Sequence, residues 1–177
     1  VVPCDEHQAY QATKAIAQHQ GPCYLRLSRI KNPTVSQGES FTLGKAQTLK
    51  EGSDVTIIAN GIMVGKALEA AQDLDKENIK ASVINLHTLK PIDSQAIISA
   101  AQKTGCVVTA EEHQTAGGLG SAVAEVLSQN HPVSIEMVAI NDTFGESGEA
   151  EELLEKYGLT AHAISEAAQK AVTRKNQ

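Results

Sequence analysis

The stretch from residue 107 to residue 127 constrains the fold of this chain more strongly than any other. It begins with the apolar run Val-Val-Thr-Ala, continues through Glu-Glu-His and a glycine-rich turn, and ends in Leu-Gly-Ser-Ala-Val-Ala-Glu-Val-Leu. The apolar run predicts a buried strand, and Leu119, Val123 and Leu127 have the spacing of one helix face. Strands that alternate with helices build a mostly parallel sheet, in which ligands and partners meet the carboxyl ends of the strands.

The same alternation recurs along most of the chain. Apolar runs predict five strands, the first of them a short edge strand, at residues 45–49, 55–59, 81–85, 106–110 and 133–140. Helical spacing and helix-capping residues predict helices at 64–74, 93–103, 119–127, 148–157 and from Thr160 onward. We therefore expect a three-layer α/β/α fold around a mostly parallel five-stranded sheet.

The first thirty residues have a separate organisation. Residues 1–3 predict the end of a strand, Asp5 caps a helix from Glu6 to about His19, and residues 23–27 predict another strand. Two parallel strands alone make a poor sheet, because parallel strands need cover on both faces and paired edges. We therefore expect three parts: the tail of another α/β domain at 1–30, a linker and edge strand at 31–50, and a complete domain at 51–177. The start at Val1 rather than Met suggests a processed, truncated or excised product.

Composition excludes several classes of partner. Lys and Arg number 15 against 21 Asp and Glu, and the resulting net charge of -6 argues against nucleic acid. No apolar run approaches the roughly 20 residues that span a bilayer, so we expect no membrane partner. Three cysteines without metal-ligand spacing, Cys4, Cys23 and Cys106, favour reduced thiols in a cytoplasmic protein.

Glu111 and Glu112 are a candidate carboxylate pair. If the strand continues through them, their side chains point to opposite faces of the sheet and cannot share one substrate atom or one metal. A polar strand end or an interface contact fits the pattern better than joint acid–base catalysis.

The glycines at residues 117, 118 and 120 follow a strand and open a helix, which is the setting of a phosphate-binding turn. The dinucleotide motif G-x-G-x-x-G requires a third glycine where Val123 stands, so the motif is incomplete. Gly61 and Gly65 form a still weaker pattern that suits a simple helix start.

Cys4 and His7 are close enough in sequence to form a thiol–imidazole pair, although a buried structural cysteine is the simpler interpretation. The other histidines have no metal-ligand spacing, and we expect no metal site within this chain: His19, His87, His113, His131 and His162.

Arg29 follows the strand predicted at residues 23–27, where an anionic ligand approaches a parallel sheet. A guanidinium can bind phosphate through two parallel hydrogen bonds. A surface ion pair is the alternative on the residues alone, and Arg26, in the middle of the strand, is expected to be structural.

Several segments together resemble the C-terminal part of transketolase, especially the short or split type. They are residues 5–10, Gly-Pro-Cys-Tyr-Leu-Arg-Leu-Ser-Arg at 21–29, Asn-Leu-His-Thr-Leu-Lys-Pro-Ile-Asp at 85–93, Glu-Glu-His with Gly-Gly-Leu-Gly-Ser-Ala-Val at 111–123, and Phe-Gly-Glu-Ser-Gly at 144–148 running into 152–159. The ordered set covers nearly the whole chain. Deoxyxylulose-phosphate synthase and the β subunit of 2-oxo acid dehydrogenase E1 share this domain and remain alternatives within the family.

The resemblance implies a transferase of the pentose phosphate pathway that moves a two-carbon ketol unit from a ketose phosphate to an aldose phosphate. Its cofactors would be thiamine diphosphate and Mg²⁺, and the Gly-Asp-Gly motif that binds the diphosphate is absent here. The glutamate that activates the cofactor also belongs to a part upstream of this chain. By the same resemblance, residues 1–30 end a pyrimidine-binding domain, and Arg29 contacts the substrate phosphate. No catalytic, cofactor-binding or metal-binding residue is expected in this chain.

The resemblance further implies a homodimer, or a heteromer with a separate N-terminal cofactor-binding part, and an isolated chain that is inactive. A non-catalytic dimerisation or docking module is the alternative of another class, and a Rossmann dinucleotide-binding protein is a weaker one.

Overall fold

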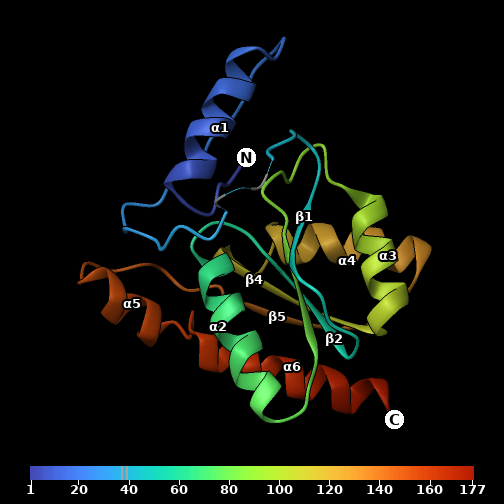
Figure 1. Cartoon of the computed structure of the whole chain (residues 1–177). Coiled ribbons are helices and arrows are strands. Elements are labelled where there is room, and N and C mark those ends of the chain that lie inside the picture. The colour runs from blue at the N-terminus through green and yellow to red at the C-terminus, as the bar shows by residue number, and fades with distance from the viewer. Residues whose placement is uncertain (37, 39) are drawn as a thin grey trace.

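The computed structural model describes residues 1–36, 38 and 40–177 (Figure 1). Positions 37 and 39 of the predicted linker lie outside the described residues. The described elements, in chain order, are α1 Glu6–Ala17, β1 Gln47–Lys50, β2 Val55–Ala59, α2 Met63–Lys76, β3 Ala81–Asn85, α3 Ser94–Thr104, β4 Cys106–Gln114, α4 Leu119–Asn130, β5 Ser134–Ile140, α5 Ala150–Lys156 and α6 Ala161–Lys175.

These strands form one sheet in the order β1-β3-β2-β4-β5. β1 is antiparallel to β3, and every other neighbouring pair is parallel. Ile57 of β2 lies beside Val83 of β3 on one side and Val108 of β4 on the other, so the centre of the sheet is continuously apolar. The predicted mostly parallel five-stranded sheet is therefore confirmed.

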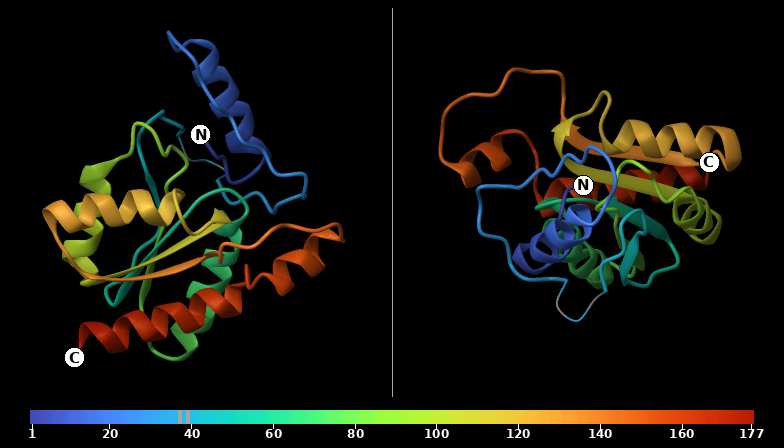
Figure 2. Two further views of the ribbon diagram at one scale, coloured as in Figure 1. Left: turned by 180° about the vertical axis from the view of Figure 1, so that it is seen from behind. Right: turned by 90° about the horizontal axis from the view of Figure 1, so that it is seen from above.

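Helices cover both faces of the sheet and complete three layers (Figure 2). α2 and α6 pack against one face, and α3 and α4 pack together against the other. β2 and β3 are buried along their whole length and are short, mostly apolar runs, which is why their bounds could be predicted from the sequence.

Polar side chains at the helix starts satisfy backbone groups as the sequence predicts. The Ala96 N–H donates to Asp93 Oδ1 at 3.2 Å, and the Ala163 N–H donates to Thr160 Oγ1 at 3.1 Å. Each bond supplies a partner for one of the N–H groups that the first turn of a helix leaves free.

We predict opposite effects for alanine at two glycines. Nothing lies within 4 Å of a Cβ placed on Gly65 inside α2, so Gly65→Ala should raise the free energy of unfolding by about 0.5 kcal/mol. Gly105, which ends α3, has a φ of +70°, so Gly105→Ala should lower it by about 1 kcal/mol. Urea unfolding of both variants measures the difference, and a gain of stability in Gly105→Ala would contradict this account of the helix end.

The structure corrects several predicted bounds. No strand forms at residues 1–3 or 23–27, although the two segments lie together, with the Arg26 N–H donating to the Val1 carbonyl at 2.9 Å. A parallel ladder needs further neighbouring strands, which these segments lack in the described part of the chain. β4 continues four residues beyond the predicted end, α1 ends at Ala17 rather than His19, and α5 begins at Ala150 rather than residue 148.

The N-terminal segment lies at the carboxyl end of the sheet, and α1 projects away from it (Figure 1). The Val2 N–H donates to the His87 carbonyl at 2.7 Å, and the Gly61 N–H donates to the Val2 carbonyl at 3.3 Å. Of the helices described, none is both long and apolar enough to cross a bilayer.

Candidate functional site

A cleft of about 790 Å³ lies beside the carboxyl ends of β4 and β5. Its walls come from residues 26–30, from the strand ends at Glu112 and Ile140, and from the segment 145–159 that contains α5. The parallel strands bring these segments together, because their carboxyl ends meet at one edge of the sheet.

Arg29 lines this cleft and is exposed. Across residues 1–36, 38 and 40–177, its side chain forms neither a hydrogen bond nor an ion pair, so its five N–H donors are available to a ligand. Arg26 behaves differently: its Nη1 donates to the Glu112 carbonyl oxygen at 2.7 Å. Arg26 is thus a structural residue, as expected, that joins the N-terminal segment to the end of β4.

The segment 145–159, which also lines the cleft, contains its own charged group. Lys156 Nζ lies 2.6 Å from Glu146 Oε1, and the Tyr157 hydroxyl donates to the same oxygen at 3.0 Å. These hydrogen bonds hold the pKa of Glu146 below its usual value. The Tyr157 hydroxyl also contacts the Phe144 carbonyl at 3.2 Å, which ties α5 to the loop after β5.

Glu112 also lines the cleft and is half-buried. Burial raises the pKa of its carboxyl group, and the nearby Arg26 guanidinium partly offsets that rise. A carboxyl group in this setting favours contacts with neutral hydroxyl groups, because an unpaired charge there is poorly solvated.

Glu111 has a different environment from Glu112. Its side chain is 2 % exposed, and its two carboxylate oxygens accept the N–H groups of Leu119 at 2.7 Å and Gly120 at 2.8 Å. It therefore caps α4, while Glu112 faces the cleft. The two carboxyl groups do not form a joint catalytic pair, in agreement with the alternation expected along a strand.

The glycine-rich turn accommodates Glu111 and leaves no room for a phosphate at the same N–H groups. A Cβ on Gly118 would lie 2.2 Å from Glu111 Oε2, and one on Gly120 would lie 2.9 Å from Thr109 Oγ1. The glycines are needed for the close approach of β4 to α4. The chain's own carboxylate occupies the positive end of this helix, where a nucleotide phosphate would otherwise bind.

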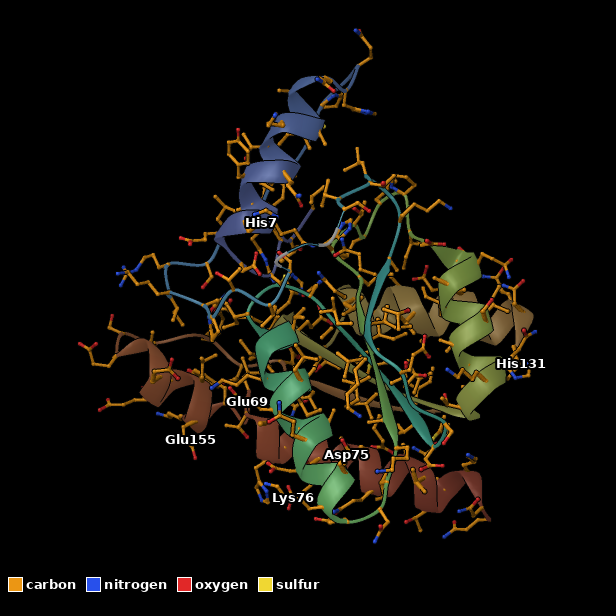
Figure 3. All side chains as sticks on the ribbon, in the orientation of Figure 1. His7, Glu69, Asp75, Lys76, His131 and Glu155 are labelled. Carbon is orange, nitrogen blue, oxygen red and sulfur yellow. The ribbon has the colours of Figure 1, made fainter. Side chains whose placement is uncertain are left out.

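Cys4 is a structural thiol. It is 1 % exposed, and Asn85 Nδ2 lies 3.4 Å from its Sγ. Burial and the neighbouring Asp5 carboxylate raise the pKa of the Cys4 thiol to about 12, which disfavours a nucleophilic thiolate. His7 lies on the first turn of α1 (Figure 3), and within the described residues no hydrogen bond joins it to Cys4.

The remaining histidines are scattered. His131 lies far from His7, which is on α1 (Figure 3), and His87 is buried against the Phe41 ring at a centroid distance of 4.3 Å. Among the residues that the structure describes, no group of three His, Cys, Asp or Glu side chains could hold a metal ion.

Asp5 has a larger structural role than the sequence predicts. Besides capping α1, its carboxylate accepts the N–H groups of Val35 and Ser36, both at 2.8 Å, and the Ser36 hydroxyl at 2.7 Å. These partners lie thirty residues away on a segment without regular structure, so no local sequence signal could have indicated them.

Comparisons with known proteins agree with this architecture. Residues 44–164 match the family described as "Transketolase, C-terminal domain". Over 177 residues the chain is 49% identical to a 6-deoxy-6-sulfo-D-fructose transketolase subunit of Clostridium sp. (strain MSTE9), covering 98% of this chain and 54% of that protein. It is 39% identical over 170 residues to an apulose-4-phosphate transketolase subunit of Phocaeicola vulgatus, covering 95% of this chain and 54% of that protein.

An enzyme with another name and a solved structure are also similar to this chain. The chain is 38% identical over 172 residues to 1-deoxy-D-xylulose-5-phosphate synthase of Heliobacterium modesticaldum, covering 95% of this chain and 27% of that protein. A solved structure described as a split-gene transketolase in an inactive beta4 tetramer superposes with a TM-score of 0.95 at 51% identity, covering 98% of this chain and 57% of that one.

The chain thus spans about half the length of the transketolase subunits that it matches. The family match covers more than half of the chain and includes the whole sheet. This chain belongs to the transketolase C-terminal domain family.

Proposed function

We propose that this chain is the C-terminal portion of a transketolase, which transfers a two-carbon ketol unit from a ketose phosphate to an aldose phosphate. The observation that carries the proposal is the match over nearly the whole chain to transketolase subunits and to the structure of a split-gene transketolase. In this proposal residues 1–30 end a pyrimidine-binding domain, residues 31–50 form a linker and edge strand, and residues 51–177 form the C-terminal domain.

Arg29 binds the anionic end of the sugar in this proposal. Its unpaired guanidinium on the wall of a cleft supports the assignment. The names of two relatives also contain a charged sugar substituent, a sulfo group in one and a phosphate in the other. Both groups are tetrahedral anions that accept two parallel hydrogen bonds from a guanidinium.

The described residues do not fit a site for thiamine diphosphate and Mg²⁺. The glycine turn at the start of α4 is occupied by Glu111, and no cluster of metal ligands exists in the part of the chain described. We therefore assign the cofactors to an N-terminal part of the enzyme. The enzyme would be a homodimer, or a heteromer of this chain with that cofactor-binding part. The free cysteines are consistent with a cytoplasmic location.

A transketolase assay tests this proposal. We expect no ketol transfer when the purified chain alone is mixed with thiamine diphosphate, Mg²⁺, a ketopentose phosphate and an aldopentose phosphate. Transfer should appear when the N-terminal cofactor-binding part is added, and that part alone is the control. Transfer by this chain alone, or none from the combined parts, would contradict the proposal.

A second candidate is the C-terminal domain of a deoxyxylulose-phosphate synthase, which the 38% identity to such an enzyme favours. The product of the assembled enzyme distinguishes the two functions. A synthase forms 1-deoxy-D-xylulose 5-phosphate, whereas a transketolase forms a ketose that retains its hydroxyl group on the first carbon. A non-catalytic dimerisation module would form neither product.

A further inference from the structure

The position of Arg29 depends on contacts made by its neighbours. Residues 26–36 have no helix or strand, so no backbone ladder holds them. The Arg29 side chain has no partner among the described residues, so nothing holds its guanidinium directly. Its location is therefore set by the points at which the segment on either side is fixed.

The amino-terminal side of this segment is fixed at Arg26. The Arg26 N–H donates to the Val1 carbonyl at 2.9 Å, and Arg26 Nη1 donates to the Glu112 carbonyl at 2.7 Å. The second bond joins the segment to the end of β4, where Glu112 lines the cleft.

The carboxyl-terminal side is fixed by Asp5. Its Oδ2 accepts the N–H groups of Val35 and Ser36, and its Oδ1 accepts the Ser36 hydroxyl and the Gln8 N–H, all within 2.7–2.8 Å. Asn32 Nδ2 adds a bond of 3.0 Å to the Cys4 carbonyl beside it. Hydrogen bonds to an ionised carboxylate are shorter and stronger than neutral ones, so Asp5 is a strong polar anchor of this segment, beside the apolar contacts of Ile30 and Val35 with the core.

Asp5 is itself held in place by the sheet. It is 6 % exposed, and four donated hydrogen bonds keep the pKa of its carboxyl group below the usual value despite its burial. The Gln8 side chain accepts the Cys4 N–H at 2.9 Å and Asn85 Nδ2 at 3.1 Å, and its Nε2 donates to Gln47 Oε1 at 2.7 Å. Asn85 ends β3 and Gln47 begins β1, so the sheet determines where Asp5 lies.

We infer that Asp5 is a positioning residue that sets the place of Arg29 against the anionic end of the substrate. This inference rests on the proposed function of Arg29. The buried carboxylate anchors the segment that carries Arg29 to the N-terminus of α1 and, through Gln8, to the strand ends. A small displacement of a binding group is costly, because a shift near 1 Å can change rates by roughly a hundredfold.

Asp5→Asn in the assembled enzyme tests the inference. Asparagine is as good a helix cap as aspartate, so α1 keeps its start. Both carboxylate oxygens of Asp5 accept hydrogen bonds, but asparagine has only one side-chain oxygen. If that oxygen keeps the contacts now made by Oδ1, the amide nitrogen cannot accept the N–H groups of Val35 and Ser36, so the segment loses part of its anchor. We expect the KM for a phosphorylated acceptor to rise roughly tenfold, and the KM for its unphosphorylated analogue and the kcat to stay within about twofold. Ser36→Ala, which removes a single donor, should produce a smaller change in the same direction.

The double variant Asp5→Asn/Arg29→Ala separates positioning from a general structural effect. If Asp5 acts through Arg29, adding Asp5→Asn to Arg29→Ala leaves the KM for the phosphorylated acceptor unchanged. The matched control is Asp93→Asn, because Asp93 also caps a helix and accepts a linker N–H, that of Ala46 at 3.1 Å. Asp93→Asn should not change the preference for phosphorylated acceptors.

The outcomes distinguish the two assignments. If Asp5→Asn raises the KM for both acceptors equally, the role of Asp5 is wrong and that of Arg29 is unaffected. The same conclusion follows if the KM increases of the two single variants multiply in the double variant. If Arg29→Ala alone does not raise the KM for the phosphorylated acceptor more than the KM for its unphosphorylated analogue, the roles of both residues are wrong. If the unmodified assembly shows no ketol transfer, the proposed function itself is contradicted.

Discussion

Glu111→Ala is expected to lower the free energy of unfolding of this chain by about 4 kcal/mol. The substitution leaves the N–H groups of Leu119 and Gly120 without an acceptor in a buried site, at a cost of about 1–3 kcal/mol each. It also removes a negative charge from the positive end of α4 and leaves a cavity beside Gly118. Water entering that cavity would recover part of the sum.

The neighbouring residue provides the control for this prediction. Glu112→Ala removes a carboxylate of the same size from the next position, but Glu112 holds Arg26 through its backbone carbonyl rather than its side chain. We expect Glu112→Ala to change the free energy of unfolding by less than about 1 kcal/mol. Glu111→Gln keeps the shape and one acceptor, so it should lie between the two. Equal stabilities of Glu111→Ala and Glu112→Ala in urea unfolding would disprove the capping role of Glu111.

Arg29→Ala in the assembled enzyme is expected to raise the KM for a phosphorylated substrate about thirtyfold. A lost charge-assisted contact to phosphate costs on the order of 2 kcal/mol, which corresponds to that factor. The KM for an unphosphorylated analogue should change little, because that analogue never makes the contact. Arg29→Lys should be intermediate, since an ammonium keeps the charge but not the paired hydrogen bonds.

Lys31 provides a matched control for the change in charge. It is exposed, lies two residues from Arg29 and does not line the cleft of about 790 Å³. Lys31→Ala removes the same formal charge, and steady-state kinetics should show no change in the preference for phosphorylated substrates. If both variants weaken that preference equally, the effect comes from the general field of the surface and not from a contact at Arg29.

The sheet could be predicted from the sequence because its central strands are buried on both faces. The runs that form β2 and β3 are mostly apolar, carry no charged residue and are followed or preceded by turn residues, so their ends could be located. The bounds of β4 were less clear, because Glu111, Glu112 and His113 are polar and yet extend the strand. Glu111 is tolerated there because α4 supplies two N–H groups to its carboxylate.

The N-terminal segment and the cleft could be predicted only in part. The apolar run before Arg29 predicts that this residue follows a strand. Residues 23–27 do lie at the carboxyl end of the sheet, but they form no strand. The contacts that hold the segment join Asp5 to Ser36 and Arg26 to Glu112, at separations of 31 and 86 residues. Such contacts follow from the folded topology, and neither periodicity nor capping patterns contain that information.

Transfer of an isotopic label tests the central claim most directly. A ketose phosphate labelled with ¹³C at its first two carbons is mixed with an aldose phosphate and the enzyme assembled from this chain and its cofactor-binding part. Both labelled carbons should appear together in a new ketose, which is the aldose acceptor lengthened by two carbons. Label that stays in the donor, or a 1-deoxy ketose as the product, would contradict that claim.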